Sequence, residues 1–174
     1  MIIILHNIRS CLNVGAILRT AEGFGVERAV FSGYTPRVDD ERELPHLREK
    51  LNGQIAKTAL GAEKLVELES FEEVETGLER LKGQGYKIVG LENNLEDARK
   101  ILATRENLEV ISEKMGEKVA LLLGEEVHGI ERRLYEYIDM FLEIPMEGKK
   151  ESFNVSVATG VALFYLRLAA ERKV

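Results

Sequence analysis

Residues 1–21 of the chain read MIIILHNIRSCLNVGAILRTA, and this stretch decides the fold. The uninterrupted apolar run Ile2–Leu5 predicts a strand that is buried on both faces, which is typical of parallel sheets. The apolar side chains of Asn13–Phe24 then recur at helical spacing, and Gly25 marks the end of the predicted helix. A strand, a polar loop and a helix in this order predict an α/β domain.

The same alternation of elements continues along the chain. Further strands are predicted at Arg28–Ser32, Leu65–Leu68, Tyr86–Leu91, Val119–Leu123 and Phe141–Ile144. Further helices are predicted at 44–51, from Ser70 to Gly83 or Gly85, at 95–103, at 130–137 and at 154–172. Ser70 and Glu73 have the spacing of a capping box. Together these elements predict a mostly parallel sheet with helices on both faces.

The composition is that of one globular domain covering residues 1–174. Hydrophobic residues make up 45% of the chain and charged residues 31%, with 15 Gly and 3 Pro, which excludes collagen-like and disordered classes. The single cysteine, Cys11, excludes a disulfide framework and a cysteine-rich zinc site. No apolar run approaches the roughly 18 residues of a membrane span, and no basic stretch precedes the first apolar run. We therefore expect a cytoplasmic protein.

The formal net charge of −6 argues against a protein that coats nucleic acid without specificity. The acidic residues gather in the middle of the chain, around 63–79, whereas several arginines lie in the first third. A local basic surface is therefore compatible with the composition, and charges scattered over solvated faces are the alternative.

Three polar loops stand at the ends of predicted strands, and the first leads into a helix that contains Asn13, Gly15 and Arg19. Ligands bind at the carboxyl ends of parallel strands, so Asn13 is expected at that edge. Arg19 lies four residues beyond Gly15, from where its guanidinium can reach the same opening and hold a phosphate. The alternative is an Asn13 that caps the helix and an Arg19 that faces solvent.

The second loop follows the strongly apolar strand Val119–Leu123 and begins Gly124-Glu125-Glu126. A glycine there lets the backbone approach a flat ligand, and one of the two carboxylates can face the cleft. The alternative is a pair of acidic side chains that stabilise the start of the next helix. His128 has no second histidine or carboxylate at helical spacing, so no metal site is expected.

The third loop runs from Ile144 through Ser152 and Asn154 into the last predicted helix. Either Ser152 or Asn154 can cap that helix. If the three strands are neighbours, the three loops converge on one crevice. The last helix has so wide an apolar face that more than one neighbour must bury it, and a second subunit is one candidate.

Taken together, these stretches resemble the three signature motifs of the SpoU/TrmH family, the 2′-O-ribose RNA methyltransferases of the SPOUT superfamily. The motifs are Asn-Val-Gly-Ala-Ile-Leu-Arg-Thr-Ala at 13–21, Leu-Gly-Glu-Glu-Val-His-Gly at 123–129, and Ile-Pro-Met to Ser-Phe-Asn-Val-Ser-Val-Ala at 144–158. Each motif alone is weak, but all three in this order and spacing are specific.

The resemblance implies a SPOUT-type α/β fold with a deep C-terminal trefoil knot, which nothing in the periodicity reveals. It also implies a homodimer, S-adenosylmethionine as the cofactor, an RNA substrate (tRNA or rRNA), and neither a metal nor a membrane. By motif position, the catalytic set is Asn13, Arg19, Glu126, Ser152 and Asn154. The implied cofactor site is lined by Leu91, Leu123, Gly124, Ile144, Met146, Ser152 and Phe153. Phe153 stands where the family more often has leucine.

A ribose hydroxyl is a poor nucleophile, so methyl transfer to it needs an aligned acceptor and a stabilised oxyanion. Arg19 is the candidate for this role, either as the base or as a clamp on the phosphate and the oxyanion. A guanidinium resists deprotonation, which favours the clamp. The sequence leaves open whether Arg19 serves its own subunit or the partner. Two other functions remain as alternatives: RNA binding without catalysis, and methylation of a base.

Overall fold

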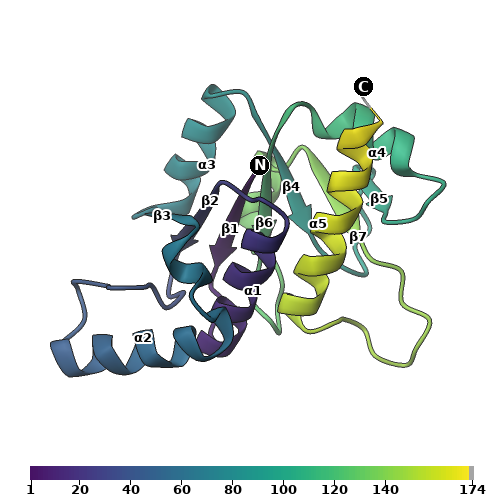
Figure 1. Ribbon diagram of the computed structural model, residues 1–174. Coiled ribbons are helices and arrows are strands. Elements are labelled where there is room, and N and C mark those ends of the chain that lie inside the picture. The colour runs from purple at the N-terminus through teal and green to yellow at the C-terminus, as the bar shows by residue number, and fades with distance from the viewer. Residues whose placement is uncertain (173–174) are drawn as a thin grey trace.

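Residues 1–172 are described by a computed structural model, and they build one parallel sheet of seven strands (Figure 1). The strands are β1 (Ile2–His6), β2 (Arg28–Ser32), β3 (Glu67–Ser70), β4 (Tyr86–Leu91), β5 (Lys100–Leu102), β6 (Lys118–Leu123) and β7 (Met140–Glu143). Their order across the sheet is β3-β2-β1-β6-β4-β7-β5, and all neighbours are parallel. The predicted α/β class is confirmed.

Helices cover both faces of the sheet, as predicted. The helices are α1 (Cys11–Gly23), α2 (Pro45–Ala59), α3 (Val74–Gly83), α4 (Leu108–Met115) and α5 (Val155–Glu171), with 3-10 turns at Ala62–Lys64 and Arg132–Tyr137. One core cluster joins α1, α4 and α5 to the sheet, and the other joins α3 and the turn at 132–137 to the opposite face. Figure 1 shows α1 and α5 side by side in front of the sheet.

The first strand explains this layering. Ile3 and Leu5 belong to the core under α1 and α5, whereas Ile2 and Ile4 belong to the core under α3. Successive side chains of a strand point to opposite faces, so an unbroken apolar run is required where both faces are covered. All four side chains are fully buried.

The central pairing of the sheet positions the site. β1 and β6 are neighbours, and their register sets Leu5 opposite Leu123. The loops that follow the two strands therefore begin at the same level of the carboxyl edge. Residues 7–10 and residues 124–130, more than 110 positions apart in the chain, lie side by side for this reason.

The helix after β1 begins earlier than predicted. α1 starts at Cys11, and Ser10 caps it by accepting a hydrogen bond from the backbone N of Asn13 at 3.3 Å. The alternative that Asn13 is the cap is therefore wrong. Asn13 lies in the first turn of α1, and its side chain is free to bind elsewhere.

Several other predicted elements differ in the structure. Residues 95–103 are not a helix: they contain the short strand β5, and the helix of this region is α4. The predicted capping box is wrong, because α3 begins at Val74, after Glu73, without a side-chain cap. α2 is almost twice as long as predicted, and residues 132–137 form a 3-10 turn rather than an α-helix.

The last strand is inserted between two earlier ones. β7 pairs with β4 on one side and with β5 on the other, so the chain leaves β7 beside the segment that joins β4 to β5. The side-chain amide of Asn93, in that segment, donates to the carbonyl oxygens of Ile144 (3.2 Å) and Glu151 (3.4 Å). The predicted knot concerns this crossing, and it stays a prediction.

Candidate active site

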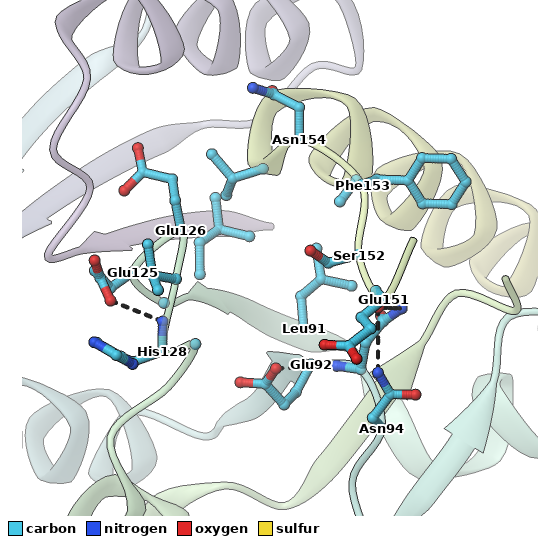
Figure 2. A pocket seen from close by; sticks show the side chains of 17 residues that line it. Leu91, Glu92, Asn94, Glu125, Glu126, His128, Glu151, Ser152, Phe153 and Asn154 are labelled. Carbon is cyan, nitrogen blue, oxygen red and sulfur yellow. Dashed lines mark hydrogen bonds between the residues drawn. The ribbon is translucent and has the colours of Figure 1, made fainter. Parts of the chain in front are cut away.

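A cavity of about 380 Å³ opens at the carboxyl ends of β4 and β6 (Figure 2). Its walls come from three segments that are distant in the sequence, namely 91–94, 123–129 and 151–158. The residues of the predicted cofactor site that line it are Leu91, Leu123, Gly124, Ser152 and Phe153. The two that do not are Ile144, which is buried, and Met146, which is half-buried.

Three of the predicted catalytic side chains form one chain of hydrogen bonds. The amide nitrogen of Asn13 donates to Glu126 Oε1 at 3.0 Å, and the amide nitrogen of Asn154 donates to Asn13 Oδ1 at 3.1 Å. Glu126 and Asn154 also line the cavity, where Figure 2 shows them on its wall. All three predicted loops therefore meet at the rim of one cavity.

The carboxylate of Glu126 is held by the start of the first motif. In addition to Asn13, its oxygens accept hydrogen bonds from the backbone N–H groups of Arg9 at 3.2 Å and Ser10 at 3.4 Å. Burial alone raises the pKa of Glu126, but the bonds from Arg9 and Asn13 outweigh it and hold that pKa below its ordinary value. Glu126 is therefore an ionised, fully engaged group that positions its neighbours.

The loop of the second motif is folded tightly on itself. Glu125 and Gly129 exchange two backbone hydrogen bonds, at 3.0 and 2.9 Å, and Glu125 Oε2 accepts from the backbone N of His128 at 2.8 Å. A Cβ atom at Gly124 would overlap the backbone of Gly129. Only glycine leaves room for this close approach, which sets the shape of the cavity wall.

The third motif ends at the helix cap. Asn154 caps α5, with its Oδ1 accepting from the backbone N of Ser156 at 2.9 Å, so Asn154 and not Ser152 is the cap. Ser152 and Phe153 are exposed and line the cavity (Figure 2). The side chain of Asn154 thus performs two tasks at once: it caps α5 and donates to Asn13.

Arg19 is the predicted catalytic residue that the structure does not bring to the cavity. It lies six residues beyond Asn13 on α1, about 9 Å along the helix axis. It is exposed, and its guanidinium makes no hydrogen bond or ion pair with any residue of 1–172. Within one subunit, Arg19 is a free cation on the outer face of α1.

The model of the SpoU rRNA methylase family matches residues 1–164. The chain belongs to this family. The recognition made from the three motifs is thereby confirmed, since the match spans all of them.

Curated relatives of this SpoU-family chain are longer than it is. An uncharacterized tRNA/rRNA methyltransferase from Borreliella burgdorferi is 30% identical over 166 residues, which are 95% of this chain and 63% of the relative. The 23S rRNA (guanosine-2′-O-)-methyltransferase RlmB from Xylella fastidiosa is 30% identical over 164 residues, 94% of this chain and 57% of the relative. The chain spans about three fifths of the length of these relatives.

Solved structures share the fold. The AdoMet-bound rRNA methyltransferase from Sinorhizobium meliloti superposes with a TM-score of 0.75 at 20% identity, over 95% of this chain and 55% of that one. The A. aeolicus TrmH/SpoU tRNA modifying enzyme gives 0.71 at 24% identity, over 99% and 76%. The SpoU fold of this chain follows from these superpositions.

One residue of the SpoU site was missed by the sequence reasoning. Glu92 accepts hydrogen bonds from the backbone N of Ile130 at 2.7 Å and of Asn93 at 3.0 Å, so it ties the end of β4 to the loop of the second motif. Burial raises the pKa of this carboxyl above its ordinary value, and the two backbone hydrogen bonds, which lower it, do not offset the effect of burial. The feature of the sequence that could have indicated Glu92 is its position directly after a predicted strand.

Within residues 1–172, no group of three or more His, Cys, Asp or Glu side chains is arranged to hold a metal ion. Within the same residues, no helix has the length and apolar character needed to cross a membrane. Cys11 is buried in the core, where burial raises the pKa of its thiol.

Proposed function

We propose that this SpoU-family chain transfers a methyl group from S-adenosylmethionine to a ribose 2′-hydroxyl of tRNA or rRNA in the cytoplasm. The observation that carries the proposal is the hydrogen-bonded series Glu126–Asn13–Asn154, which gathers one residue of each motif at the rim of the cavity. The names of the relatives, tRNA/rRNA methyltransferase and 23S rRNA (guanosine-2′-O-)-methyltransferase, support the same chemistry.

The cavity suits the cofactor in size and lining. Its volume of about 380 Å³ lies within the range of small-molecule sites, and apolar and polar groups both face it. Leu91, Leu123 and Phe153 offer apolar contacts for an adenine ring, and Gly124 leaves the backbone open for a close approach. Glu92, Glu125 and Glu151 add negative charge around a site for a cationic ligand.

When bound, S-adenosylmethionine supplies a methyl group that is attached to a sulfonium. Transfer of that methyl group leaves the sulfur as a neutral thioether. The residues of the chain then have to align the acceptor and stabilise its charge. Glu126 keeps Asn13 in place, and Asn13 in turn orients Asn154. Ser152, whose hydroxyl lies on the cavity wall, is positioned to hold the ribose.

Arg19 takes part through a second subunit. Three apolar side chains on the neighbouring helices α1 and α5 (Figure 1) are about half exposed. They are Leu12 on α1 and Val157 and Phe164 on α5, with exposed fractions between 49% and 52%. A homodimer formed through this face buries these side chains. It also brings Arg19 of the partner subunit towards the cavity, where a guanidinium can clamp a phosphate and stabilise the oxyanion.

The test is a methylation assay with labelled S-adenosylmethionine, purified protein, and total bacterial tRNA or rRNA. Nucleoside analysis of the product RNA is expected to find the label on a ribose. Label on a base would contradict the proposal and would indicate a methyltransferase that acts on a base. The absence of calorimetric binding of S-adenosylhomocysteine, together with no label in any RNA, would favour an RNA-binding protein that has lost catalysis.

A further inference from the structure

Three aromatic side chains are exposed among residues 1–172, and one of them has no role in the proposed site. Phe153 lines the cavity and Phe164 belongs to the proposed dimer face. Tyr34 is the most exposed of the three, with 56% of its surface accessible, and it stands just beyond the end of β2. An exposed ring at the carboxyl edge of the sheet is accessible to a ligand.

The turn that carries Tyr34 is fixed to the first motif. The backbone N of Tyr34 donates to Asn7 Oδ1 at 3.2 Å. The next residue, Thr35, is buried; its hydroxyl donates to the carbonyl of Leu5 at 2.8 Å and accepts from the backbone N of Ile8 at 3.0 Å. Gly33 has φ +61°, and a Cβ there would overlap Asn7, so the turn fits only with glycine before Tyr34.

The turn of Tyr34 lies near the rim of the cavity. Asn7, which accepts from the backbone N of Tyr34, begins the loop whose later residues, Arg9 and Ser10, donate to Glu126 on the cavity wall. The turn of Tyr34 is therefore bonded to the loop that borders the cavity, near the place where the acceptor ribose is proposed to sit.

Among the charged side chains around this turn, Glu131 is 40% exposed but is bonded to Asn7 and Arg133, whereas Arg9 is more exposed. Arg9 exposes 67% of its side chain, whereas Glu125, which faces it at 3.8 Å, exposes 11%. The carboxylate of Glu126 already accepts three hydrogen bonds, from the backbone of Arg9 and Ser10 and from the side chain of Asn13. Lys57 is exposed and shares an open hollow with Arg9 on the other side of the start of α1. A ligand that carries phosphates and flat rings fits this surface.

We propose that Tyr34 is a stacking platform for an unpaired base of the RNA substrate, adjacent to the nucleotide that is methylated. Proteins read unpaired RNA by stacking its bases on aromatic side chains, and such stacking tolerates any base. The bonds of the turn fix the backbone that carries the ring, so less backbone freedom is lost when a ligand binds. The inference rests on the proposed function, since it takes RNA as the substrate.

Kinetics of Tyr34 variants test the platform. Tyr34→Ala is expected to raise the KM for RNA about tenfold or more, with kcat and the affinity for S-adenosylhomocysteine nearly unchanged. Tyr34→Phe keeps the ring and is expected to stay within about twofold of the wild type. Leu65→Ala, which truncates an exposed apolar side chain before β3, is the matched control and is expected to change nothing.

A fluorescence experiment separates this inference from the proposed function. The chain contains no tryptophan, so Tyr34→Trp gives a single probe at the platform. A single-stranded oligoadenylate is expected to quench it in a saturable way, and a duplex RNA of equal length to leave it bright. Quenching without methylation by the wild type would overturn the proposed function only.

The contrary result concerns Tyr34 alone. If the wild type methylates RNA, an unquenched Tyr34→Trp together with an unchanged KM in Tyr34→Ala would overturn the platform. A change of oligomeric state in Tyr34→Ala, without a change in KM, would assign the ring to the contact with another protein chain and would overturn the inference as well.

Discussion

The rim of the cavity and the outer face of α1 and α5 differ in how complete they are. At the rim, Glu126, Asn13 and Asn154 are bonded to one another and to the backbone, and each motif supplies a partner for the next. On the outer face, Arg19 has no partner within residues 1–172, and Phe164 leaves half of its surface exposed. The rim is completed by one chain, whereas the outer face would be completed by the second subunit of the proposed dimer.

The difference shows how the site divides its tasks. The rim provides a preorganised scaffold, because a side chain that already makes its hydrogen bonds needs no reordering when a ligand binds. The proposed cationic group, Arg19, lies instead on an exposed surface of α1.

Removal of the free cation is expected to have the largest effect. Arg19→Ala should lower kcat for RNA methylation by about 100-fold or more, because a lost oxyanion donor typically costs that much. Binding of S-adenosylhomocysteine and thermal stability should change little, since Arg19 makes no hydrogen bond or ion pair with residues 1–172. Near-normal turnover by Arg19→Lys would contradict a special role for the guanidinium.

Mixed dimers decide which subunit Arg19 serves. Arg19→Ala and Glu126→Gln are each expected to be nearly inactive. If Arg19 acts across the interface, mixing the two should restore roughly a quarter of the wild-type sites, because half of the dimers are mixed and each has one intact site. No recovery on mixing would place the action of Arg19 within its own subunit.

Disruption of the outer face is expected to have the next largest effect. Phe164→Asp introduces a charge where the proposed dimer buries a ring, so the subunits should separate. Methylation should fall in proportion, about tenfold when nine tenths of the dimer is lost. Sedimentation measures the association. Val110→Asp, at an exposed apolar residue of α4, is the control; a monomeric wild type would contradict the comparison.

In stability rather than in activity, the rim is expected to show a pH-dependent effect. The native pKa of Glu126 lies below its ordinary value of 4.5, so its ionised form stabilises the fold above that pH, and the contribution is lost as the pH falls through the native pKa. Glu126→Gln should destabilise the protein by about 1–3 kcal/mol at pH 7. Melting temperatures of the two proteins should converge in acid; a constant difference would argue against the ionised carboxylate.

The strands that can be predicted from the sequence are those with a buried apolar centre. Ile2–Leu5 and Val119–Leu123 agree with the structure within one residue because both faces are covered and the apolar run is unbroken, and Arg28–Ser32 and Tyr86–Leu91 agree because their central residues are buried. β5 was missed because it has three residues at the edge of the sheet, too few to show a pattern. α4 was missed along with it, since eight residues give two helical turns.

The candidate site divides in the same way. The motifs predicted that Asn13, Glu126 and Asn154 belong to one site. The donor and acceptor of each bond could not be predicted, because these depend on the order of β1 and β6 in the sheet and on Ser10 capping α1. Glu92 was missed since its partners are backbone N–H groups, which leave no mark on the sequence.

The insertion of β7 between β4 and β5 has a consequence for synthesis. Both neighbours leave the ribosome before β7 does, and the last wall of the cavity, at 151–158, follows later still. A nascent chain can form β1, α1 and β2 early, but it cannot enclose the cavity until residues 151–158 have left the ribosome. A fragment that stops before residue 151 therefore lacks one wall of the cavity and is not expected to bind the cofactor.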